Sequence, residues 1–504
     1  MRFCFEQKDF IEQQINPEQI AIIDNKRELS WLQFEEEVNK ICLFFKENGW
    51  DKIANPIILY GHKQAEMITV IYAFMKMRLV YIPMDIIYPK QRISSIQKIA
   101  NVDLIINCTD DLLDHEETTE VQLKASEFII KKQNIIALKS NVNIEDPLVY
   151  IIFTSGSTGE PKGVQISSKA VQTFTHWMMN DFGFSSKDIF INIANFSFDL
   201  SVYELMSFSA IGSTLLLNDL ETTKDSEILM NRIDKYKGSI WVSTPSFALT
   251  YARIGFDIRL DSLKYFLFCG ETLPHNLALT LHKEFQSAIV YNTYGPTEAT
   301  VATTLVEITK EILEKYNPLP VGYPKPDCEI FIEKENKEDN EGEIVIVGNH
   351  VSMGYFNNKE LNKEKFFIHN GKRAFKTGDL GYYKDNMLFF KGRNDDQIKM
   401  HGFRIELNEI TNVICKNELI STAVTVGLKR NNQVKKIVSF VISKNSINNE
   451  KLKEELINYL KISLPYYMIP GDIDIIEEFP YSTSHKINRI KLIDDYLKRQ
   501  LGEN

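Results

Sequence analysis

A glycine-rich loop that follows a buried strand constrains this chain more than any other stretch of its sequence. Residues 148–153 (LVYIIF) form a short continuous apolar run, which is typical of a buried strand. The stretch that follows, TSGSTGEPKGV at 154–164, combines glycines, hydroxyls and one lysine. Such a loop exposes backbone N–H groups and hydroxyls without side-chain bulk, as polyphosphate binding requires. The sequence therefore predicts a phosphate-binding loop at 154–164.

The order of residues in this loop differs from that of the common nucleotide hydrolases. Lys162 follows Pro161 and precedes Gly163, whereas the Walker A pattern places Ser or Thr after the lysine. A flexible surface linker is the alternative, since Gly/Ser clusters often are linkers. The preceding strand and the embedded Pro-Lys-Gly favour phosphate binding. The predicted contacts are Thr154, Ser155, Gly156, Ser157, Thr158, Gly159 and Lys162.

Length and charge narrow the class of protein. A chain of 504 residues is too long for one ordinary core, so we expect at least two domains. The net charge of −10 argues against nucleic acid or an anionic membrane as the main partner, since both need a basic surface. The six cysteines form no C-x-x-C pair, which is typical of a reducing compartment without zinc or disulfides. The start lacks a long apolar segment, and no run of apolar residues is long enough to span a membrane. We expect a cytoplasmic protein without membrane insertion.

Strand and helix patterns alternate through the first part of the chain. Strands are predicted at 56–61, 81–85 and 102–107, with helices at 64–77 and 92–100 between them. This spacing indicates βαβ units and a parallel sheet covered on both faces. Residues 110–147 are polar and we expect them to be irregular.

Four later apolar stretches each run into a turn rich in Gly, Pro, Ser or Thr: 188–199, 238–247, 263–273 and 288–301. In open α/β sheets, ligands bind beyond the carboxyl ends of the strands. We therefore expect these turns to line one crevice, with 188–199 as a strand that ends on Asp199.

The pattern changes after about residue 318. Short alternating runs indicate antiparallel β structure, and 373–407 is expected to form hairpins. Residues 408–504 carry helix and strand patterns of their own. The predicted fold class is therefore α/β and α+β multidomain: a large N-terminal domain at 1–394, with parallel βαβ sheets and a β-rich subdomain, and a small mobile α+β lid domain at 395–504.

Five motifs in this order resemble the adenylate-forming superfamily, which contains acyl- and aminoacyl-activating enzymes. They are TSGSTGEPKGV (154–164), FSFDLS (196–201), NTYGPTEATV (292–301), KTGD (376–379) and GRNDDQIKMHGFRIEL (392–407). The stretches FSFDLSVYEL, FLFCGETLP and NTYGPTEATVA look most like the D-alanine-activating ligases of the superfamily. The resemblance covers essentially the whole chain. It implies ATP and Mg²⁺ as cofactors, D-alanine or another small amino acid as substrate, and a phosphopantetheinylated carrier protein as partner in teichoic acid D-alanylation.

The resemblance also assigns the nucleotide contacts. It places Asn292 at the adenine edge, Tyr294 on the adenine ring and Asp379 on the ribose hydroxyls. Thr297 would lie near the α-phosphate, and Glu298 would bind Mg²⁺ together with Thr154. The local alternative for YGPTE and for Asp379 is an ordinary turn. The further nucleotide contacts implied are Thr293, Gly295, Pro296, Phe390, Lys391, Gly392 and Arg393.

Three residues are implied to contact the amino acid. Asp199 would bind its ammonium group, whose charge offsets the burial of a carboxylate. Asp199 as the N-cap of a following helix is the alternative, and both roles are compatible. The resemblance links Cys269 to choosing the D over the L hand, although a lone buried cysteine is more often plain core. Val301 would close the pocket around a methyl group.

The C-terminal domain is implied to deliver a catalytic lysine to the substrate carboxylate and the α-phosphate. The candidate is Lys486, in EEFPYSTSHKINRIKL. The superfamily pattern has glycine where this chain has His485, and aspartate where it has Asn488. Glycine permits backbone conformations that histidine tolerates less well. Two alternatives therefore stay open: a catalytically impaired adenylate-binding protein, and a stand-alone amino-acid adenylation enzyme of a peptide natural-product pathway.

Overall fold

The computed structural model describes residues 15–111, 113, 118–124, 127–132, 146–156, 159–254, 260–334, 336, 339–430, 433–444, 448–480 and 487–501. The predictions for Ser157, Thr158, His485 and Lys486 lie outside these residues. Contacts divide the chain into two compact units. The first comprises residues 1–86, 97–153 and 163–394, and the second comprises 87–96, 154–162 and 395–504. The glycine loop thus belongs to the second unit.

A seven-stranded sheet forms the first layer of the larger unit, in the order β7-β6-β5-β3-β4-β8-β9. Its predicted strands and helix are present as β3 (Ile57–Gly61), α2 (Ala65–Met77) and β4 (Tyr81–Asp85), and β3 pairs in parallel with β4 and with β5 (Leu104–Asn107). The expectation of an irregular segment at 110–147 was wrong in part. There β6 (Thr119–Lys124) extends the sheet beside β5 and pairs antiparallel with β7 (Glu127–Lys132). The short apolar alternation of β6 is enough to form a strand because the edge of β5 is available for pairing. The remaining elements around this sheet are α1 (Trp31–Glu47), η1 (Trp50–Lys52), α3 (Lys90–Ala100), β8 (Leu148–Thr154) and β9 (Lys162–Ser167).

A nine-stranded sheet forms the second layer and carries the predicted crevice turns. Its order is β16-β15-β14-β13-β12-β10-β11-β1-β2. Strands β10 (Ile189–Asn192), β12 (Ile240–Ser243), β13 (Tyr265–Phe268) and β14 (Ile289–Tyr294) are parallel, so their carboxyl ends share one edge. After β14 the chain reverses into β15 (Thr304–Glu307), which pairs antiparallel with it. The other strands are β1 (Ile20–Ile23), β2 (Glu28–Ser30), β11 (Thr214–Leu217) and β16 (Tyr323–Pro324).

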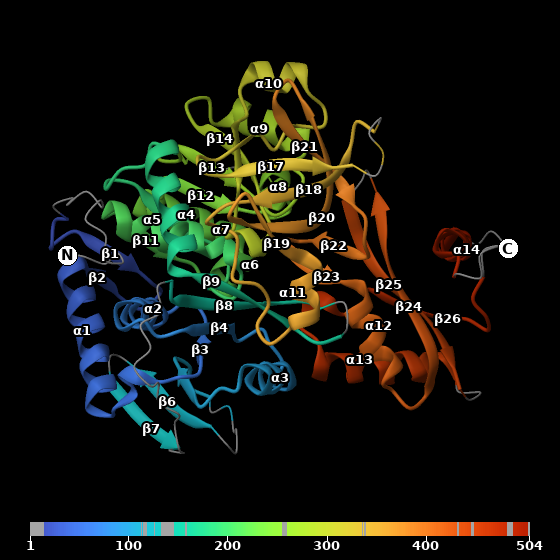
Figure 1. Cartoon of the computed structure of the whole chain (residues 1–504), viewed down its shortest axis with the longest axis horizontal. Helices are drawn as coiled ribbons and strands as arrows, with labels where there is room; N and C mark the ends of the chain where they lie inside the picture. Colours follow the sequence, from blue (N-terminus) through green and yellow to red (C-terminus); the bar gives the residue numbers. More distant parts are fainter. Residues whose placement is uncertain are drawn as a thin grey trace. The chain divides into compact units, whose positions relative to one another are not determined.

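The predicted strand at 188–199 was too long. Strand β10 ends at Asn192, and Asp199 opens the short 3₁₀ helix η2 (Asp199–Ser201) before α5 (Val202–Ile211). The apolar residues after Asn192 pack in a loop, where Phe196 is buried, so their hydrophobicity reflects burial without strand pairing. Helix α5 packs against α4 (Ser168–Asp181), as Figure 1 shows. The other helices of this layer are α6 (Leu220–Lys224), α7 (Ser226–Tyr236), α8 (Pro245–Ile254), α9 (His275–Glu284), η3 (Thr297–Ala299) and α10 (Lys310–Lys315).

The predicted antiparallel β structure after residue 318 is confirmed. The sheet runs antiparallel from β17 (Glu329–Glu333) through β18 (Gly342–Val347) to β20 (Lys372–Lys384). Strand β20 also pairs antiparallel with β19 (Phe366–His369) and with β21 (Met387–Arg393). Helix α11 (Lys359–Lys365) precedes β19. Tyr294, at the end of β14, shares a hydrophobic cluster with Phe375 and Leu388 of this sheet. That cluster joins the end of β14 to β20 and β21.

The second unit is an α+β fold. The hairpin β22 (Gln397–Met400) and β23 (Phe403–Glu406) leads into α12 (Leu407–Cys415) and a sheet of β24 (Ile420–Arg430), β25 (Gln433–Ser443) and β26 (Asp472–Ile475). Helices α12 and α13 (Asn449–Ser463) lie on one side of this sheet and α14 (Arg489–Leu501) on the other (Figure 1). The short helix η4 (Tyr466–Met468) follows α13. In the part of the chain with a described structure, no helix is both long and apolar enough to cross a membrane.

Candidate active site

A buried triad joins β14 to β20 and β21 of the β-rich subdomain. The Tyr294 hydroxyl donates a hydrogen bond of 2.6 Å to Oδ2 of Asp379, and Arg393 pairs with Oδ1 of the same carboxylate. Asp379 and Arg393 are cross-strand neighbours in the ladder of β20 and β21. Burial, reinforced by the negative charge of Asp379, raises the pKa of Tyr294 well above its usual range, so this hydroxyl stays protonated as a donor. The structure thus brings three predicted nucleotide residues together.

Asn292 lies at the end of the same strand with one unsatisfied group. Its side-chain N–H donates to the carbonyl of Pro320 at 2.7 Å. Its Oδ1 is buried and has no hydrogen-bond partner among the described residues. An unpaired buried acceptor is costly unless a ligand or water satisfies it. The exocyclic amino group of adenine is a donor, so this acceptor fits the predicted adenine contact.

Thr293, between these two residues, serves the protein itself. Its hydroxyl donates to the carbonyl of Phe268 at 2.8 Å and accepts from the Tyr203 hydroxyl at 2.8 Å. Strand alternation places Thr293 on the face opposite to Asn292 and Tyr294. Its geometry therefore supports the sheet, and Tyr203 is a neighbour that sequence reasoning missed.

The predicted residues of β21 have different surroundings. The ring of Phe390 lies 6.1 Å from the ring of Tyr294, centroid to centroid. Lys391 instead forms an ion pair with Glu341, in which both side chains are about half exposed. Gly392 has open space where a side chain would begin. Of these, Phe390 and Arg393 are the residues that the structure joins to Tyr294 and Asp379.

The turn between β14 and β15 has an unusual backbone. At Gly295 an added Cβ would lie 2.5 Å from Cα of Ala302, so the two arms of the turn approach too closely for any side chain. Pro296 precedes the 3₁₀ helix Thr297–Ala299. Thr300 and Val301 then have positive φ angles, 54° and 69°, which are rare for β-branched residues.

Glu298 points into the interior from this turn. Its side chain is fully buried, and the Tyr355 hydroxyl donates to its Oε1 at 2.7 Å. Among the described residues no three His, Cys, Asp or Glu side chains cluster as a metal cage. Mg²⁺ commonly binds through one or two carboxylates together with substrate phosphates, so a single buried carboxylate is compatible with the predicted role.

The three predicted amino-acid contacts share one neighbourhood. The Cys269 thiol, just after β13, lies 3.7 Å from the carbonyl oxygen of Val301, and both residues are buried. Burial raises the pKa of Tyr203 well above its usual range, and the nearby Cys269 and Asp199 contribute to the rise. Tyr203 therefore lies within electrostatic reach of both. Its position, four residues after Asp199 at the start of α5, was the available sequence signal.

The capping alternative for Asp199 is not supported. Phe198 and Ser201 occupy the N-cap positions of η2 and α5, and neither helix has a side-chain cap. Asp199 is half-buried in the first turn of η2. Its carboxylate is thus placed at the helix start without serving as the cap.

The glycine loop, in the second unit, is held by the segment 404–409. The Ser155 hydroxyl donates to the carbonyl of Arg404 at 2.8 Å and accepts from the backbone N–H of Glu406 at 3.1 Å. The backbone N–H of Gly156 donates to Glu409 at 2.9 Å. Lys162 forms an ion pair with Glu406 at 3.1 Å, in which both side chains are largely buried. Two carboxylates thus satisfy the groups that were predicted to hold phosphate.

Two further loop residues have distinct surroundings. The Thr154 hydroxyl is buried and makes no hydrogen bond within the described chain. Gly159 has φ of 87°, and a Cβ there would lie 3.0 Å from the side chain of Asn412. The glycine is therefore required at 159 by both its backbone conformation and its close neighbour.

Next to the predicted lysine loop, Asn488 has a structural role that its sequence position did not reveal. Its side-chain oxygen accepts from the backbone N–H of Lys491 at 3.1 Å, at the start of α14. Asparagine caps helices about as well as aspartate does. The replacement of aspartate by Asn488 is therefore compatible with an intact start of α14.

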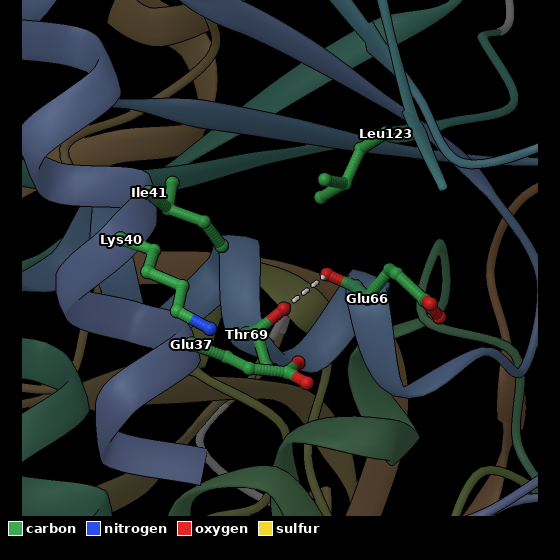
Figure 2. A pocket seen from close by; sticks show the side chains of 6 residues that line it. All are labelled: Glu37, Lys40, Ile41, Glu66, Thr69 and Leu123. Carbon is green, nitrogen blue, oxygen red and sulfur yellow. Dashed lines mark hydrogen bonds between the residues drawn. The ribbon is translucent and has the colours of Figure 1, made fainter. Parts of the chain in front are cut away.

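A separate hollow lies away from all of these residues. Figure 2 shows it between α1, α2 and β6, with a hydrogen bond of 2.9 Å from the Thr69 hydroxyl to the carbonyl of Glu66. Its lining residues are Glu37, Lys40, Ile41, Glu66, Thr69 and Leu123. No predicted site residue lines it.

Comparison with known proteins defines the class to which these features belong. Residues 11–356 match the family model described as AMP-binding enzyme. The chain therefore belongs to the AMP-binding enzyme family.

Its relatives within that family are more specific. The chain is 36% identical over 486 residues to the D-alanine–D-alanyl carrier protein ligase of Staphylococcus haemolyticus, covering 96% of this chain and 97% of the relative. It is 35% identical to the ligase of the same name from Bacillus cytotoxicus, covering 95% and 97%.

Solved structures show the same fold at lower identity. A Vibrio cholerae adenylation domain in complex with glycyl-adenosine-5'-phosphate matches with a TM-score of 0.81 at 20% identity, covering 97% of this chain and 96% of that one. An o-succinylbenzoate CoA synthetase from Bacillus subtilis matches with a TM-score of 0.80 at 19% identity, covering 95% and 96%. The adenylate-forming fold expected from the motifs is confirmed.

Proposed function

We propose that this chain is a ligase that activates D-alanine with ATP and transfers the D-alanyl group to the phosphopantetheine thiol of a carrier protein. The observation that carries the proposal is the nearly full-length similarity to D-alanine–D-alanyl carrier protein ligases. The Cys269–Val301 contact at the carboxyl ends of β13 and β14 supports a small substrate. Modification of teichoic acid and a cytoplasmic location, both expected from the sequence, belong to this proposal.

The reaction has two steps. A carboxylate oxygen of D-alanine attacks the α-phosphorus of ATP, which forms an acyl–phosphate bond and releases pyrophosphate. The thiol sulfur of the carrier then attacks the acyl carbon, which forms a thioester, releases AMP and gives up the thiol proton. Both steps bring electron-rich groups together, so oriented donors and cations must meet the charge that develops.

The nucleotide would be held by residues of the larger unit. Asp379 would accept the ribose hydroxyls, since each of its oxygens can accept more than one hydrogen bond, and among the described residues Tyr294 bonds to one oxygen and Arg393 to the other. The unpaired Oδ1 of Asn292 would accept from adenine, and Tyr294 would stack on its ring. Thr297 would donate to the α-phosphate.

The resident metal in this proposal is Mg²⁺. Its buried carboxylate ligand in the larger unit would be Glu298. The ion, when bound, supplies positive charge to the phosphate oxygens. Tyr355 orients the Glu298 carboxylate through its hydroxyl hydrogen bond.

Amino-acid recognition would rest on Asp199, Cys269 and Val301. The Asp199 carboxylate would pair with the substrate ammonium, which a fatty acid lacks. Cys269 and Val301 would limit the space for the amino-acid side chain in one of the two configurations, D or L, of the α-carbon.

The first test is amino-acid-dependent exchange of pyrophosphate into ATP with D-alanine, L-alanine, glycine and serine. We expect D-alanine to support the fastest exchange. A preference for an L residue would instead favour the stand-alone adenylation enzyme of a natural-product pathway. Binding of AMP without exchange for any amino acid would favour the impaired adenylate-binding protein.

The second test addresses the catalytic lysine. Lys486→Ala should reduce adenylation by roughly 10²–10³-fold, because it removes a cation from the developing charge at the α-phosphate. The exposed Lys498 on α14 offers a matched control, and Lys498→Ala should leave the rate unchanged. Equal rates for the two variants would remove Lys486 from the catalytic residues.

A further inference from the structure

Val301 lies at the centre of a strained turn. The backbone N–H of Ala302 donates to the carbonyl of Thr300 at 2.9 Å, which closes a γ-turn around Val301 at a φ of 69°. This form of γ-turn is rare and strained even for unbranched residues. A conformation of this kind costs of order 1–3 kcal/mol and persists only where surrounding contacts enforce it.

The contacts that enforce this turn come from several elements. The Cys269 thiol lies 3.7 Å from the carbonyl of Val301. The Thr300 hydroxyl donates to the carbonyl of His350 at 2.7 Å. The next carbonyl along, that of Ala302, accepts a hydrogen bond of 3.1 Å from the side-chain amino group of Lys325.

Lys325 is an unusual residue for this place. Its exposed fraction is 2%, although lysine is almost never fully buried unless it is paired. Its amino group lies over two aromatic rings of α4, 5.6 Å from the centre of Phe174 and 5.3 Å from that of Trp177. Its backbone N–H also donates to the carbonyl of Thr303 at 2.8 Å. Both its backbone and its side chain therefore bind the turn.

We propose that Lys325 is a positioning residue for amino-acid selectivity, whose amino group holds the Ala302 carbonyl and so keeps Val301 in the strained conformation that closes the pocket on a small side chain. The inference rests on the proposed function. Lys325 acts through the turn, without touching the substrate.

The chemistry of the residue explains why lysine suits this role. A long aliphatic chain fills the apolar space beside Phe174 and Trp177, while its terminal donor reaches one carbonyl. An apolar residue of similar length would fill the same space and leave the buried Ala302 carbonyl unpaired. An unpaired buried carbonyl favours rearrangement of the backbone that carries it.

The test compares Lys325→Met, which keeps the length and removes the donor, with Lys325→Arg, which keeps a donor and a cation. Exchange of pyrophosphate is measured with D-alanine, D-2-aminobutyrate and D-valine. For Lys325→Met we expect the KM for D-alanine to rise and the preference for D-alanine over D-2-aminobutyrate to fall about tenfold, the scale of one methylene in a closed pocket. The KM for ATP should change by less than about twofold, because the variant opens the amino-acid pocket and therefore weakens the binding of the amino acid alone. Lys325→Arg should retain most of the preference.

A control variant separates this effect from the general loss of a cation. Arg232 also donates to backbone carbonyls, those of Asp24 and Leu217, and lies over the ring of Tyr236. Arg232→Met should leave the amino-acid preference unchanged. An unchanged preference in folded Lys325→Met would overturn the inference.

A second variant keeps the inference testable if Lys325→Met folds poorly. Val301→Gly removes the strain, since glycine adopts positive φ freely. In that background Lys325→Met should change the preference much less than it does alone, and an equal change in both backgrounds would contradict coupling through the turn. Absence of exchange by the unmodified protein with every amino acid would instead contradict the proposed function itself.

Discussion

The glycine loop and the turn after β14 are held by different kinds of contact. In the loop, Gly156 and Lys162 are bound by the carboxylates of Glu409 and Glu406. In the turn, the partners of Thr300 and Ala302 are a backbone carbonyl and a buried lysine. A phosphate group has the charge and acceptors to replace a carboxylate, whereas both partners of the turn, Lys325 and the backbone of His350, are buried in the larger unit. Under the proposed function, we therefore expect an exchangeable phosphate site in the glycine loop, and we call the turn after β14 the fixed frame.

The largest effect is expected for the buried triad at the end of β14, directly before this turn, and is tested by Asp379→Asn. It removes the counter-charge of Arg393, whose side chain is 10% exposed, and should destabilise the larger unit by about 3–5 kcal/mol. Adenylation should fall roughly a hundredfold as Tyr294 and Arg393 lose their common partner. Denaturant unfolding and pyrophosphate exchange measure the two effects.

The surface pair of Asp385 with Lys315 is the matched control, since both side chains are about half exposed. Asp385→Asn should alter stability by no more than about 1 kcal/mol. If the two variants behave alike, the triad is not part of a fixed frame.

The exchangeable site is tested by Glu406→Gln. This change removes the charge that competes for Lys162, so the KM for ATP should fall by roughly fivefold, equivalent to about 1 kcal/mol. Glu333→Gln, which breaks an exposed pair with Lys376, should leave this KM unaltered. A KM for ATP that stays constant or rises in Glu406→Gln would show that the loop carboxylates do not compete with phosphate.

The smallest effect concerns pH. Burial lowers the pKa of Lys325 to about 7, although nearby Cys328 opposes the shift; His350 is the other titratable neighbour. An exposed lysine titrates near pH ~10.4, so the unfolded chain binds more protons than the folded one between these values. The contribution of Lys325 to stability is therefore lowest below pH 7 and rises as the pH increases through this window.

Unfolding of the wild-type protein and of Lys325→Met at pH 6 and pH 9 measures this contribution. The wild type should gain about 2–3 kcal/mol relative to the variant between the two values. If the difference in unfolding free energy between the wild type and Lys325→Met is the same at pH 6 and pH 9, Lys325 does not titrate between these values in the folded protein.

The sequence was informative where a local pattern determines the structure. The strand at 81–85 has the predicted bounds. The order of the motifs along the chain also grouped Tyr294, Asp379 and Arg393, which the structure brings together: Asp379 and Arg393 are cross-strand neighbours, and the Tyr294 hydroxyl donates to Asp379.

What could not be predicted depends on contacts between distant residues. Tyr355 reaches Glu298, and Lys325 reaches Ala302, without any spacing that a periodic pattern could reveal. The same holds for Phe196, whose apolar character suggested a longer strand although it packs beneath Lys63 in a loop. Hydrophobicity reports burial but does not identify the partner.

One consequence follows from the close approach at Gly295. The strand that presents Asn292 and Tyr294 and the turn that presents Val301 are successive parts of one hairpin, joined where Gly295 lies against Ala302. Under the proposed function, a substitution at Gly295 is therefore expected to disturb nucleotide affinity and amino-acid selectivity together. Libraries that leave position 295 unvaried and vary Cys269, just after the neighbouring strand β13, offer a way to separate the two properties.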